Sequence, residues 1–272
     1  MWTTSHSFIP MISSEAGSSL TTANWQEVGI ETLAYTLEDL LLKPGYSILM
    51  RIADCKKYLA WPGRLVLNAS NLARNKEGIY TIVSPYDGSK MKFNSSELIA
   101  LLCHLNPDMI LLPKGLEADW PESILTFIPV DEAERAKPTS PFGVYFVVDS
   151  AILSEQFYQR FAQWAEVPRY IINAPMDSII ELAQEKNVFL ESNLPAEDAL
   201  NGRMYAAQGL IDLQDPQYAL CFDLLDEACS CPTCTQRFTQ AYLHHLLGQT
   251  PLLCQRFLIQ HNISQIVKRV KS

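Results

Sequence analysis

Short apolar runs recur along most of the chain, and each is rich in β-branched and aromatic residues. Polar and apolar residues do not alternate inside these runs, which is typical of parallel strands that are covered on both faces. The pattern predicts eight buried strands, over residues 8–12, 32–37, 64–69, 109–114, 125–130, 143–148, 169–174 and 188–193.

Segments with helical patterning lie between most of the predicted strands. They cover residues 22–28, 38–42 together with 47–59, 95–105, 154–165 and 177–186. Strands that alternate with helices form parallel sheets, and a chain of 272 residues is long enough for one closed barrel of eight such units. The predicted fold class is therefore α/β, a (β/α)8 TIM barrel.

Two of the connections are too short for a full helix. Residues 115–124 separate the fourth predicted strand from the fifth, and residues 131–142 separate the fifth from the sixth. Because a parallel crossover needs about a dozen residues including its helix, we expect a barrel that is partly eroded on one side. By contrast, residues 79–83 and 90–93 flank Tyr86-Asp87-Gly88, which predicts a β-hairpin with an Asp-Gly turn.

Three cysteines lie within six residues of one another, at Cys229, Cys231 and Cys234. Three thiolates and one imidazole make a closed tetrahedral Zn²⁺ site, which is typical of structural zinc because no position remains for water. A redox cluster or a chance grouping is the alternative interpretation. The absence of a secretory signal and the presence of histidines downstream favour zinc.

Three histidines compete for the fourth metal position. His244 and His245 lie in an apolar helical run, where a histidine packs or caps more often than it binds a metal. The spacing favours His261 as the fourth ligand. The predicted metal site is therefore Cys229, Cys231, Cys234 and His261 around a structural Zn²⁺, which would hold this part of the chain folded.

Composition fits an intracellular protein. Hydrophobic residues make up 48% of the chain, so it can bury one large core. The first 20 residues do not resemble a signal peptide, and no segment has the length of apolar sequence that a membrane helix needs, so we expect a cytoplasmic location without membrane contact. A formal net charge of −9 gives no overall attraction to nucleic acid but leaves room for a local basic patch.

The C-terminal segment also carries a family resemblance. The pattern C-x-C-x-x-C, then A-Y-L-H-H-L at 241–246 and H-N at 261–262, resembles the zinc subdomain of tRNA-guanine transglycosylases, the queuine and archaeosine tRNA-ribosyltransferases. That family exchanges a guanine in tRNA for a 7-deazaguanine base through an aspartate nucleophile on a (β/α)8 barrel. The resemblance implies a reduced barrel over residues 1–204 and a zinc-binding subdomain over residues 205–272, packed together as one unit.

The family's catalytic run F-D-x-x-x-P-T-R-N-A-R-N-G is matched by residues 190–202 of this chain. The match places Glu191 at the nucleophilic aspartate, and glutamate extends the carboxylate by one methylene. The two arginines of the run become Glu197 and Leu200. The family's D-S-G-G-F-Q becomes the sequence that starts at Asn68, and an amide cannot shuttle a proton as the acid/base aspartate does.

Other substrate-binding motifs of the family are also replaced. The base-reading F-D-E-C becomes Pro113-Lys114-Gly115-Leu116, so Lys114 is either a new substrate ligand or a surface lysine. The glycine-rich loops become residues 128–130 and 147–152, and the second includes Asp149. Asp149 and Glu191 are expected near the carboxyl ends of strands, where barrel active sites form, although helix caps explain acidic residues there equally well.

Three functions remain open on the sequence. The preferred one is a catalytically inactive, transglycosylase-like protein linked to tRNA queuosine or 7-deazaguanine modification, which acts as a partner or accessory subunit. The second is a divergent base-exchange or N-glycosidic-bond enzyme that uses Glu191, and the third is an authentic transglycosylase. The resemblance implies a homodimer, or a heterodimer with a catalytic transglycosylase, through the apolar faces of residues 241–247 and 257–263; tRNA is a further possible partner.

Overall fold

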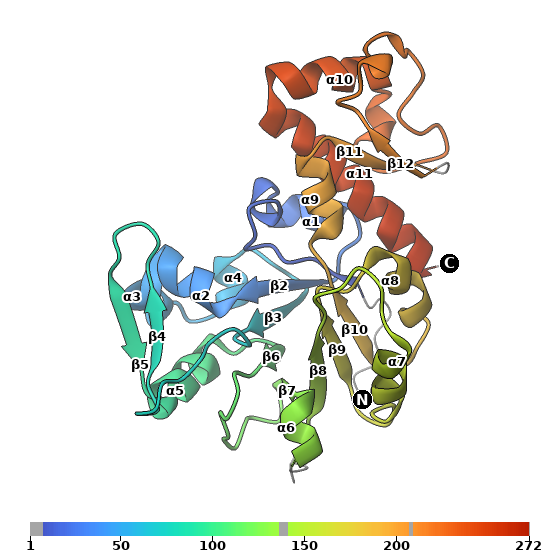
Figure 1. The fold of residues 1–272 in the computed structure, drawn as a ribbon. Coiled ribbons are helices and arrows are strands. Elements are labelled where there is room, and N and C mark those ends of the chain that lie inside the picture. The colour runs from blue at the N-terminus through green and yellow to red at the C-terminus, as the bar shows by residue number, and fades with distance from the viewer. Residues whose placement is uncertain (1–7, 136–140, 207–208, 272) are drawn as a thin grey trace.

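Eight parallel strands form the central sheet of the protein (Figure 1). The computed structural model describes residues 8–135, 141–206 and 209–271. Within them, all eight strands predicted from the sequence are present, at β1 (Phe8–Ile9), β2 (Thr32–Thr36), β3 (Arg64–Asn68), β6 (Met109–Leu111), β7 (Leu125–Pro129), β8 (Gly143–Val147), β9 (Arg169–Ile172) and β10 (Val188–Glu191).

The sheet closes into a barrel. Its strand order is β1-β10-β9-β8-β7-β6-β3-β2, and every ladder in it is parallel. Across the remaining seam, Ala34 on β2 donates to the carbonyl of Pro10 at 3.0 Å, and Ile12 donates to the carbonyl of Ala34 at 2.9 Å. The (β/α)8 fold class predicted from the sequence is confirmed.

Helices cover the barrel unevenly. Among the described residues no helix lies between β6 and β7, and only the six-residue α6 follows β7, so the predicted erosion falls where the connections are short. Residues 136–140 of the second connection lie outside the described part of the chain. The helices of the barrel are α1 (Thr22–Glu27), α2 (Leu37–Leu40), α3 (Tyr46–Leu49), α4 (Cys55–Tyr58), α5 (Ser95–Leu105), α6 (Val130–Arg135), α7 (Glu155–Ala162), α8 (Met176–Leu182) and α9 (Leu194–Leu200), with a 3-10 turn at Gly17–Ser19 and a π turn at Leu41–Gly45.

One predicted helix is divided in the structure, and another begins where the sequence placed it. The segment predicted as one helix over residues 47–59 is divided into α3 and α4. Asp54 caps α4 by accepting from the backbone N–H of Lys57, so a new helix starts there. Helix α5 begins at Ser95 as expected, and Asn94 is its N-cap in a capping box with Glu97.

Large side chains fill the inside of the barrel. Phe127, Tyr170 and Phe189 come from three different strands, and their ring centroids lie 5.4–6.2 Å apart. Tyr145 is buried beside them and donates to the carbonyl of Leu112 at 3.0 Å. The interior is therefore a packed core rather than a channel.

A two-stranded hairpin stands beside the barrel in the connection that leaves the carboxyl end of β3 (Figure 1). It pairs β4 (Tyr80–Val83) with β5 (Lys90–Phe93) in antiparallel register, and its turn includes the predicted Asp87-Gly88. Gly88 has a φ of +69°, which glycine adopts without the steric cost that a side chain would bring. The hairpin predicted from the sequence is confirmed.

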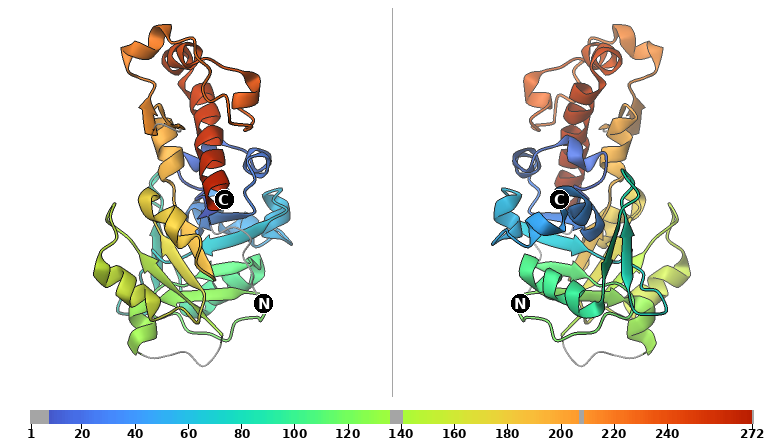
Figure 2. Two further views of the ribbon diagram at one scale, coloured as in Figure 1. Left: turned by 90° about the vertical axis from the view of Figure 1, so that its right-hand side faces the viewer. Right: turned by 90° about the vertical axis from the view of Figure 1, so that its left-hand side faces the viewer.

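The C-terminal segment rises from one end of the barrel (Figure 2). After α9 it forms the hairpin β11 (Arg203–Ala206) and β12 (Gly209–Asp212), the 3-10 turns Pro216–Leu220 and Cys234–Gln236, and the helices α10 (Gln240–Gln249) and α11 (Pro251–Lys271). Helix α11 runs back along α9 and reaches α8 and β1. The division at residues 204 and 205 stays a prediction, but α11 joins the two parts through one continuous hydrophobic core.

Asn262 ties α11 to the hairpin that precedes the cysteines. Its side-chain carbonyl accepts from the backbone N–H of Tyr205 at 2.9 Å, and its amide donates to the carbonyls of Pro195 and Arg203, each at 3.0 Å. The side chain is fully buried, so these bonds satisfy groups that water does not reach.

None of the helices in the described residues is both long and apolar enough to span a membrane.

Candidate functional site

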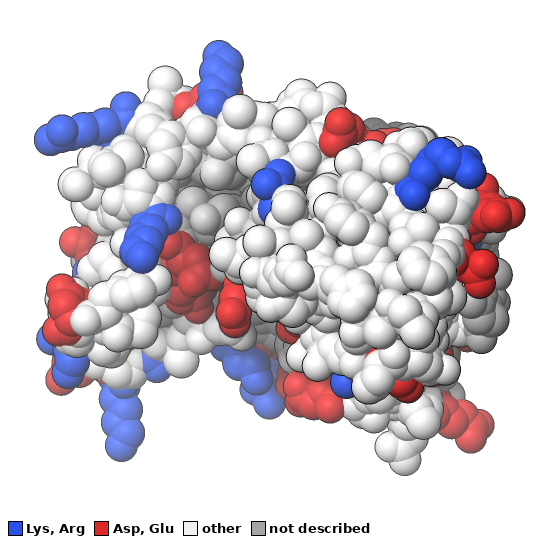
Figure 3. Space-filling model, turned by 90° about the horizontal axis from the view of Figure 1, so that it is seen from above, with Lys and Arg blue, Asp and Glu red and all other residues white. Residues whose placement is uncertain are grey.

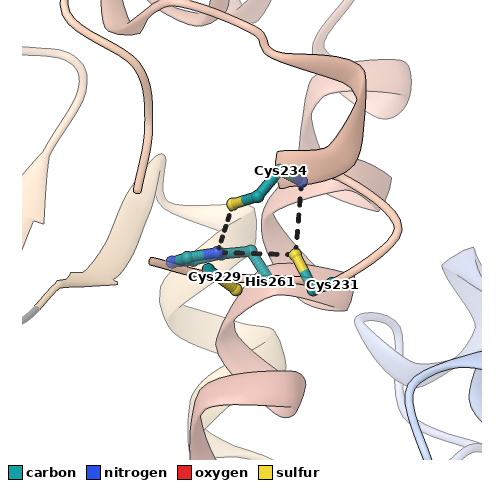
Figure 4. Close-up of side chains that lie close together, drawn as sticks. All are labelled: Cys229, Cys231, Cys234 and His261. Carbon is teal, nitrogen blue, oxygen red and sulfur yellow. Dashed lines mark hydrogen bonds between the residues drawn. The ribbon is translucent and has the colours of Figure 1, made fainter. Parts of the chain in front are cut away.

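The three cysteines converge on one point: Cys229 and Cys231 lie in an irregular loop, and Cys234 begins the 3-10 turn that follows it (Figure 4). The backbone N–H of Cys234 donates to the Sγ of Cys231 at 3.3 Å, which turns the loop back on itself. Thr233, between them, donates to the carbonyl of Phe257 and so attaches the loop to α11. Cys231 and Cys234 are buried and Cys229 is half-buried.

His261 completes the group from the middle of α11. Its Nε2 lies 2.7 Å from the carbonyl oxygen of Tyr205, an acceptor only, so the proton of the neutral ring belongs on Nε2. The other ring nitrogen, Nδ1, then faces the thiols as a free lone pair, 3.2 Å from the Sγ of Cys234 and 3.7 Å from that of Cys231. A carbonyl partner of this kind fixes the tautomer of a histidine that binds a metal.

The four groups have the spacing of a metal site. The ligand atoms of Cys229, Cys231, Cys234 and His261 all lie within 4.8 Å of one another. Sulfurs at the usual zinc–sulfur distance from one tetrahedral ion are about 3.8 Å apart, so the group contracts only slightly around it. Hydrogen bonding with Cys231, and then with Cys234, holds the pKa of the Cys229 thiol well below its usual value. The cluster can bind a metal ion.

The two competing histidines have other partners. His244 Nδ1 lies 2.7 Å from the carbonyl of Leu213, and His245 Nε2 lies 3.1 Å from that of Ala219. Both histidines therefore attach α10 to the preceding loop. The four predicted ligands are brought together as expected, and their metal-binding role stays a prediction.

A second polar group lies at the carboxyl end of the barrel strands. Asn68 ends β3 and Glu191 ends β10, and the amide nitrogen of Asn68 lies 3.4 and 3.3 Å from the two carboxylate oxygens of Glu191. Tyr170 on β9 donates its hydroxyl hydrogen to Oε2 of Glu191 at 2.8 Å. Asn68 and Glu191 are each only 3% exposed, so this group is enclosed by the barrel.

Burial changes the protonation of Glu191. Removal of the carboxylate from water raises the pKa of Glu191 to about 7, and the hydrogen bonds from Tyr170 and then Asn68 oppose that rise. Burial, together with the neighbouring carboxylate, raises the pKa of Tyr170 well above its usual value, so Tyr170 remains a hydrogen-bond donor. The oxygen of the Asn68 amide is also occupied, since it accepts from the hydroxyl and the backbone N–H of Ser70.

Lys114 and Asp149 do not join this group. The Lys114 side chain is 70% exposed, and its Nζ lies 3.9 Å from a carboxylate oxygen of Asp131 on α6. Asp149 is exposed in the loop after β8. Of the four residues predicted to form a substrate site, the structure therefore brings together only Asn68 and Glu191.

Sequence reasoning missed Tyr170 and Tyr205. Tyr170 shows one usable signal, because a phenol in an otherwise apolar strand needs a hydrogen-bond partner when it is buried. Tyr205 acts through its backbone carbonyl, so nothing in its side chain indicates the contact with His261.

A comparison with models of known protein families finds a match for the C-terminal part of the chain. The family model described as "Queuine tRNA-ribosyltransferase" matches residues 165–272. The matched segment contains β9, β10 and the whole C-terminal segment with its Cys3His cluster. It therefore covers Glu191 but not Asn68.

Individual relatives extend the similarity over nearly the whole chain. Queuine tRNA-ribosyltransferase of Solidesulfovibrio magneticus is 23% identical, with 94% of this chain and 83% of the relative covered. The Nitratidesulfovibrio vulgaris protein of the same name is 24% identical, with 97% and 84% covered, and that of Thermoanaerobacter sp. is 22% identical, with 96% and 83% covered. These alignments span 311 to 318 positions, more than the 272 residues of this chain, so the relatives contain internal segments that it lacks.

Proposed function

Because the chain belongs to the queuine tRNA-ribosyltransferase family, we propose that it serves tRNA queuosine modification as a non-catalytic subunit that pairs with a catalytic member of the family. One observation carries this proposal. The residue at the position of the family's nucleophile, Glu191, is buried and bonded to Tyr170 and to the residue at the acid/base position, Asn68.

The chemistry of a glycosidic exchange requires a carboxylate that can reach the sugar carbon. Both oxygens of Glu191 are occupied by hydrogen bonds, and burial raises the pKa of its carboxyl group to about 7, so that protonation competes with ionisation. A protonated or fully hydrogen-bonded carboxyl group is a poor nucleophile. Moving Glu191 toward a substrate would also leave the Tyr170 hydroxyl without a partner in an apolar surrounding, which costs free energy.

The remaining substrate-binding positions support the same interpretation. Asn68 offers an amide, which does not exchange protons at neutral pH. Lys114 lies with Asp131, and Asp149 is exposed at a different strand end. No two of these three residues are brought together by any contact in the described part of the chain.

We further propose that the Cys3His cluster binds one structural Zn²⁺. Three thiolates and the imidazole of His261 complete a tetrahedral shell, and such a closed shell stabilises the fold without taking part in the reaction. The hydrogen bond from His261 to Tyr205 would then transmit the restraint to the β11–β12 hairpin.

The proposed partner surface lies on the C-terminal segment. Exposed apolar side chains occur at and just after the end of the 3-10 turn at 216–220, on α10 and on the first turn of α11, and Figure 3 shows that the upper face of this segment is mostly uncharged. We call this group the C-terminal apolar surface; its members are Leu220, Phe222, Tyr242, Leu252 and Leu253. Leu220, Phe222 and Leu252 are each more than 70% exposed, which is unusual for large apolar residues in one region.

This surface differs from the one expected on sequence. Residues 257–263 were expected to present an apolar face, but Leu258, Ile259 and Ile263 are buried. Helix α11 packs that side against α9 and β11, so those residues belong to the core of the protein. Only the start of α11 contributes to the exposed surface.

Reconstitution tests the proposal. The chain would be mixed with a purified catalytic queuine tRNA-ribosyltransferase, and the complex would be measured by sedimentation together with the rate of guanine exchange in tRNA. We expect a heterodimer and an exchange rate that depends on the presence of this chain. A chain that stays separate from the catalytic protein, as a monomer or as a homodimer, would contradict the accessory role.

A further inference from the structure

An open cleft of about 510 Å³ lies between three parts of the chain. Its walls are α1, α11 and the segment 230–236, which includes Cys231 and Cys234. A volume of this size is typical of sites that bind small molecules. Neither Asn68, nor Glu191, nor any member of the Cys3His cluster is among the residues that line it, so the cleft is separate from both groups described above.

Two hydrogen bonds join α1 to α11 at this cleft, and all four of their side chains line it. Arg256 donates from Nη2 to Oδ1 of Asn24 at 3.2 Å. Gln260 donates from Nε2 to Oε2 of Glu27 at 3.4 Å. On each helix the two residues are three or four positions apart, so the two bonds lie on successive turns, about 5–6 Å from each other. The charged partners fix the orientation of both amides, because a guanidinium only donates and a carboxylate only accepts.

The pair of Asn24 and Arg256 leaves hydrogen-bond donors unused. Oδ1 of Asn24 accepts from Arg256 and from the backbone N–H and hydroxyl of Thr21, whereas its Nδ2 group donates to no residue that the structure describes. Arg256 is exposed and uses one of its five N–H groups in this contact. Within residues 8–135, 141–206 and 209–271 it forms no ion pair. This pair therefore offers N–H donors and a positive charge.

The pair of Glu27 and Gln260 leaves acceptors unused. Among the described residues, nothing donates to Oε1 of Glu27 or to the side-chain oxygen of Gln260. Gln260 is only 8% exposed and lines the cleft, so a molecule bound there can supply the donor that its oxygen lacks. Glu27 is exposed and forms no ion pair in the described part of the chain. This pair therefore offers acceptors and a negative charge.

Helix packing alone does not account for this arrangement. The two bonds between α1 and α11 use four atoms, and the unused donors and acceptors are separated onto successive turns. Phe257 is half-buried, follows Arg256 on α11 and also lines the cleft. Its ring offers an apolar contact to the carbon atoms of a bound molecule. The cleft is therefore complementary to a small molecule with opposite charges at its two ends.

We propose that the cleft binds a free amino acid. Its carboxylate contacts Asn24 and Arg256, and its ammonium group contacts Glu27 and Gln260. An ammonium group has three donors and no acceptor, and a carboxylate only accepts, so each end matches one pair. Charge-assisted hydrogen bonds of about 2.8 Å at both ends let a molecule of this length reach the two pairs. A longer peptide fits less well, because its charged ends are farther apart than the two pairs.

Direct binding measurements test this proposal. Ligand-observed NMR would screen the common amino acids as probes against the full-length protein, and calorimetry would measure the affinity of each one that binds. We expect at least one to bind. Its N-acetyl form lacks the ammonium charge and its carboxamide form lacks the carboxylate charge, so we expect each to bind about tenfold or more weakly. No binding by any amino acid at about 10 mM, or binding of either blocked form as tight as that of the free amino acid, would overturn the proposal.

Two variants assign the two ends of the ligand. Arg256→Gln and Glu27→Gln each remove one charge from an exposed side chain, and we expect each to weaken binding about 10- to 100-fold. Arg256→Gln should bind the free amino acid and its carboxamide form equally, and Glu27→Gln should bind the free amino acid and its N-acetyl form equally. Arg51→Gln and Glu122→Gln, at exposed residues outside the cleft, are the matched controls and should bind as the natural protein does. Cleft variants that bind as tightly as these controls would overturn the proposal.

Amino-acid binding is independent of the accessory role. The measurements use the chain alone and require neither tRNA, nor guanine exchange, nor a partner protein. A chain that forms the heterodimer but binds no amino acid would refute only the cleft. A chain that binds an amino acid through Arg256 and Glu27 but forms no heterodimer would refute only the accessory role.

Discussion

Tyr170 donates a hydrogen bond to Glu191 over 2.8 Å, between the side chains of adjacent barrel strands. Both side chains point into the barrel, and Tyr170 is completely buried. The bond fixes a carboxyl group at the end of the core where relatives are expected to hold a nucleophile. Whether this chain is an enzyme therefore depends on a carboxyl group that the packed core of the barrel holds in place.

The pKa of Glu191 predicts a dependence of stability on pH. The folded-state pKa of about 7 is above the ordinary value of 4.5, so the folded protein holds this proton more tightly than the unfolded chain. The resulting contribution is fully present below pH 4.5 and is lost as pH rises through 7. Glu191→Gln removes the ionisation, so we expect the variant to gain on the order of 2–3 kcal/mol relative to the natural protein between pH 5 and pH 8.

Urea unfolding of both proteins at several pH values measures this difference. Glu122→Gln is the matched control, because Glu122 is exposed and the same substitution there should produce no such trend. A constant difference between the Glu191→Gln variant and the natural protein across this pH range would show that Glu191 is ionised throughout.

The hydroxyl of Tyr170 should itself stabilise the protein. Tyr170→Phe keeps the packed ring and leaves the buried Glu191 oxygen without its shortest hydrogen bond, so we expect a loss of about 1–3 kcal/mol. The loss should be greater at pH 8 than at pH 5, because the ionised carboxylate depends more on the donor. In the Glu191→Gln background the same change should cost less, and a double-mutant cycle of unfolding free energies measures the coupling.

Elements set by local sequence were predictable, and contacts between distant residues were not. The strands followed from apolar runs, and the Cys3His cluster followed from the close spacing of the cysteines and from the distance along the chain to His261. The bond between Asn68 and Glu191 joins residues 123 positions apart, and its geometry depends on barrel closure. The surface predicted for the interface included residues 257–263, and the structure buries Leu258, Ile259 and Ile263. The apolar pattern of α11 does not indicate which of its residues a neighbouring helix covers.

Metal analysis tests the C-terminal cluster. We expect one Zn²⁺ per chain, and Cys231→Ser should lose it and unfold the segment from about residue 229 onward, because structural zinc supplies folding free energy. Cys103→Ser, at a half-buried cysteine outside the cluster, is the control and should keep its zinc. Elemental analysis and limited proteolysis provide the two readouts; a Cys231→Ser protein with full zinc content and natural protease resistance would refute the site.

Asn262 should support the same cluster from outside it. Asn262→Ala removes three hydrogen bonds of a fully buried amide, including the one to the backbone N–H of Tyr205, whose carbonyl contacts His261. We expect a loss of about 3 kcal/mol in unfolding free energy and about a tenfold weaker zinc affinity. Competition with a chelator measures the affinity, and an unchanged value would confine Asn262 to a role in packing.

The C-terminal apolar surface predicts an interface that charge should break. Phe222→Glu and Leu252→Glu place a carboxylate in that surface, so we expect the heterodimer to dissociate at micromolar concentration while the fold is retained. Ile152→Glu is the control, because Ile152 is 77% exposed in the loop after β8, outside the surface. Sedimentation of each variant with the catalytic partner measures the effect. Undiminished association of both surface variants would place the interface elsewhere.

The central claim, that the carboxyl group of Glu191 is structural, is tested most directly by guanine exchange. Purified protein would be incubated with bulk tRNA and labelled guanine or a labelled 7-deazaguanine, beside a catalytic family member as positive control. We predict no incorporation by this chain alone, either in its natural form or as Glu191→Gln. Incorporation by the natural chain that Glu191→Gln abolishes would contradict the account and would make Glu191 the nucleophile of a divergent enzyme.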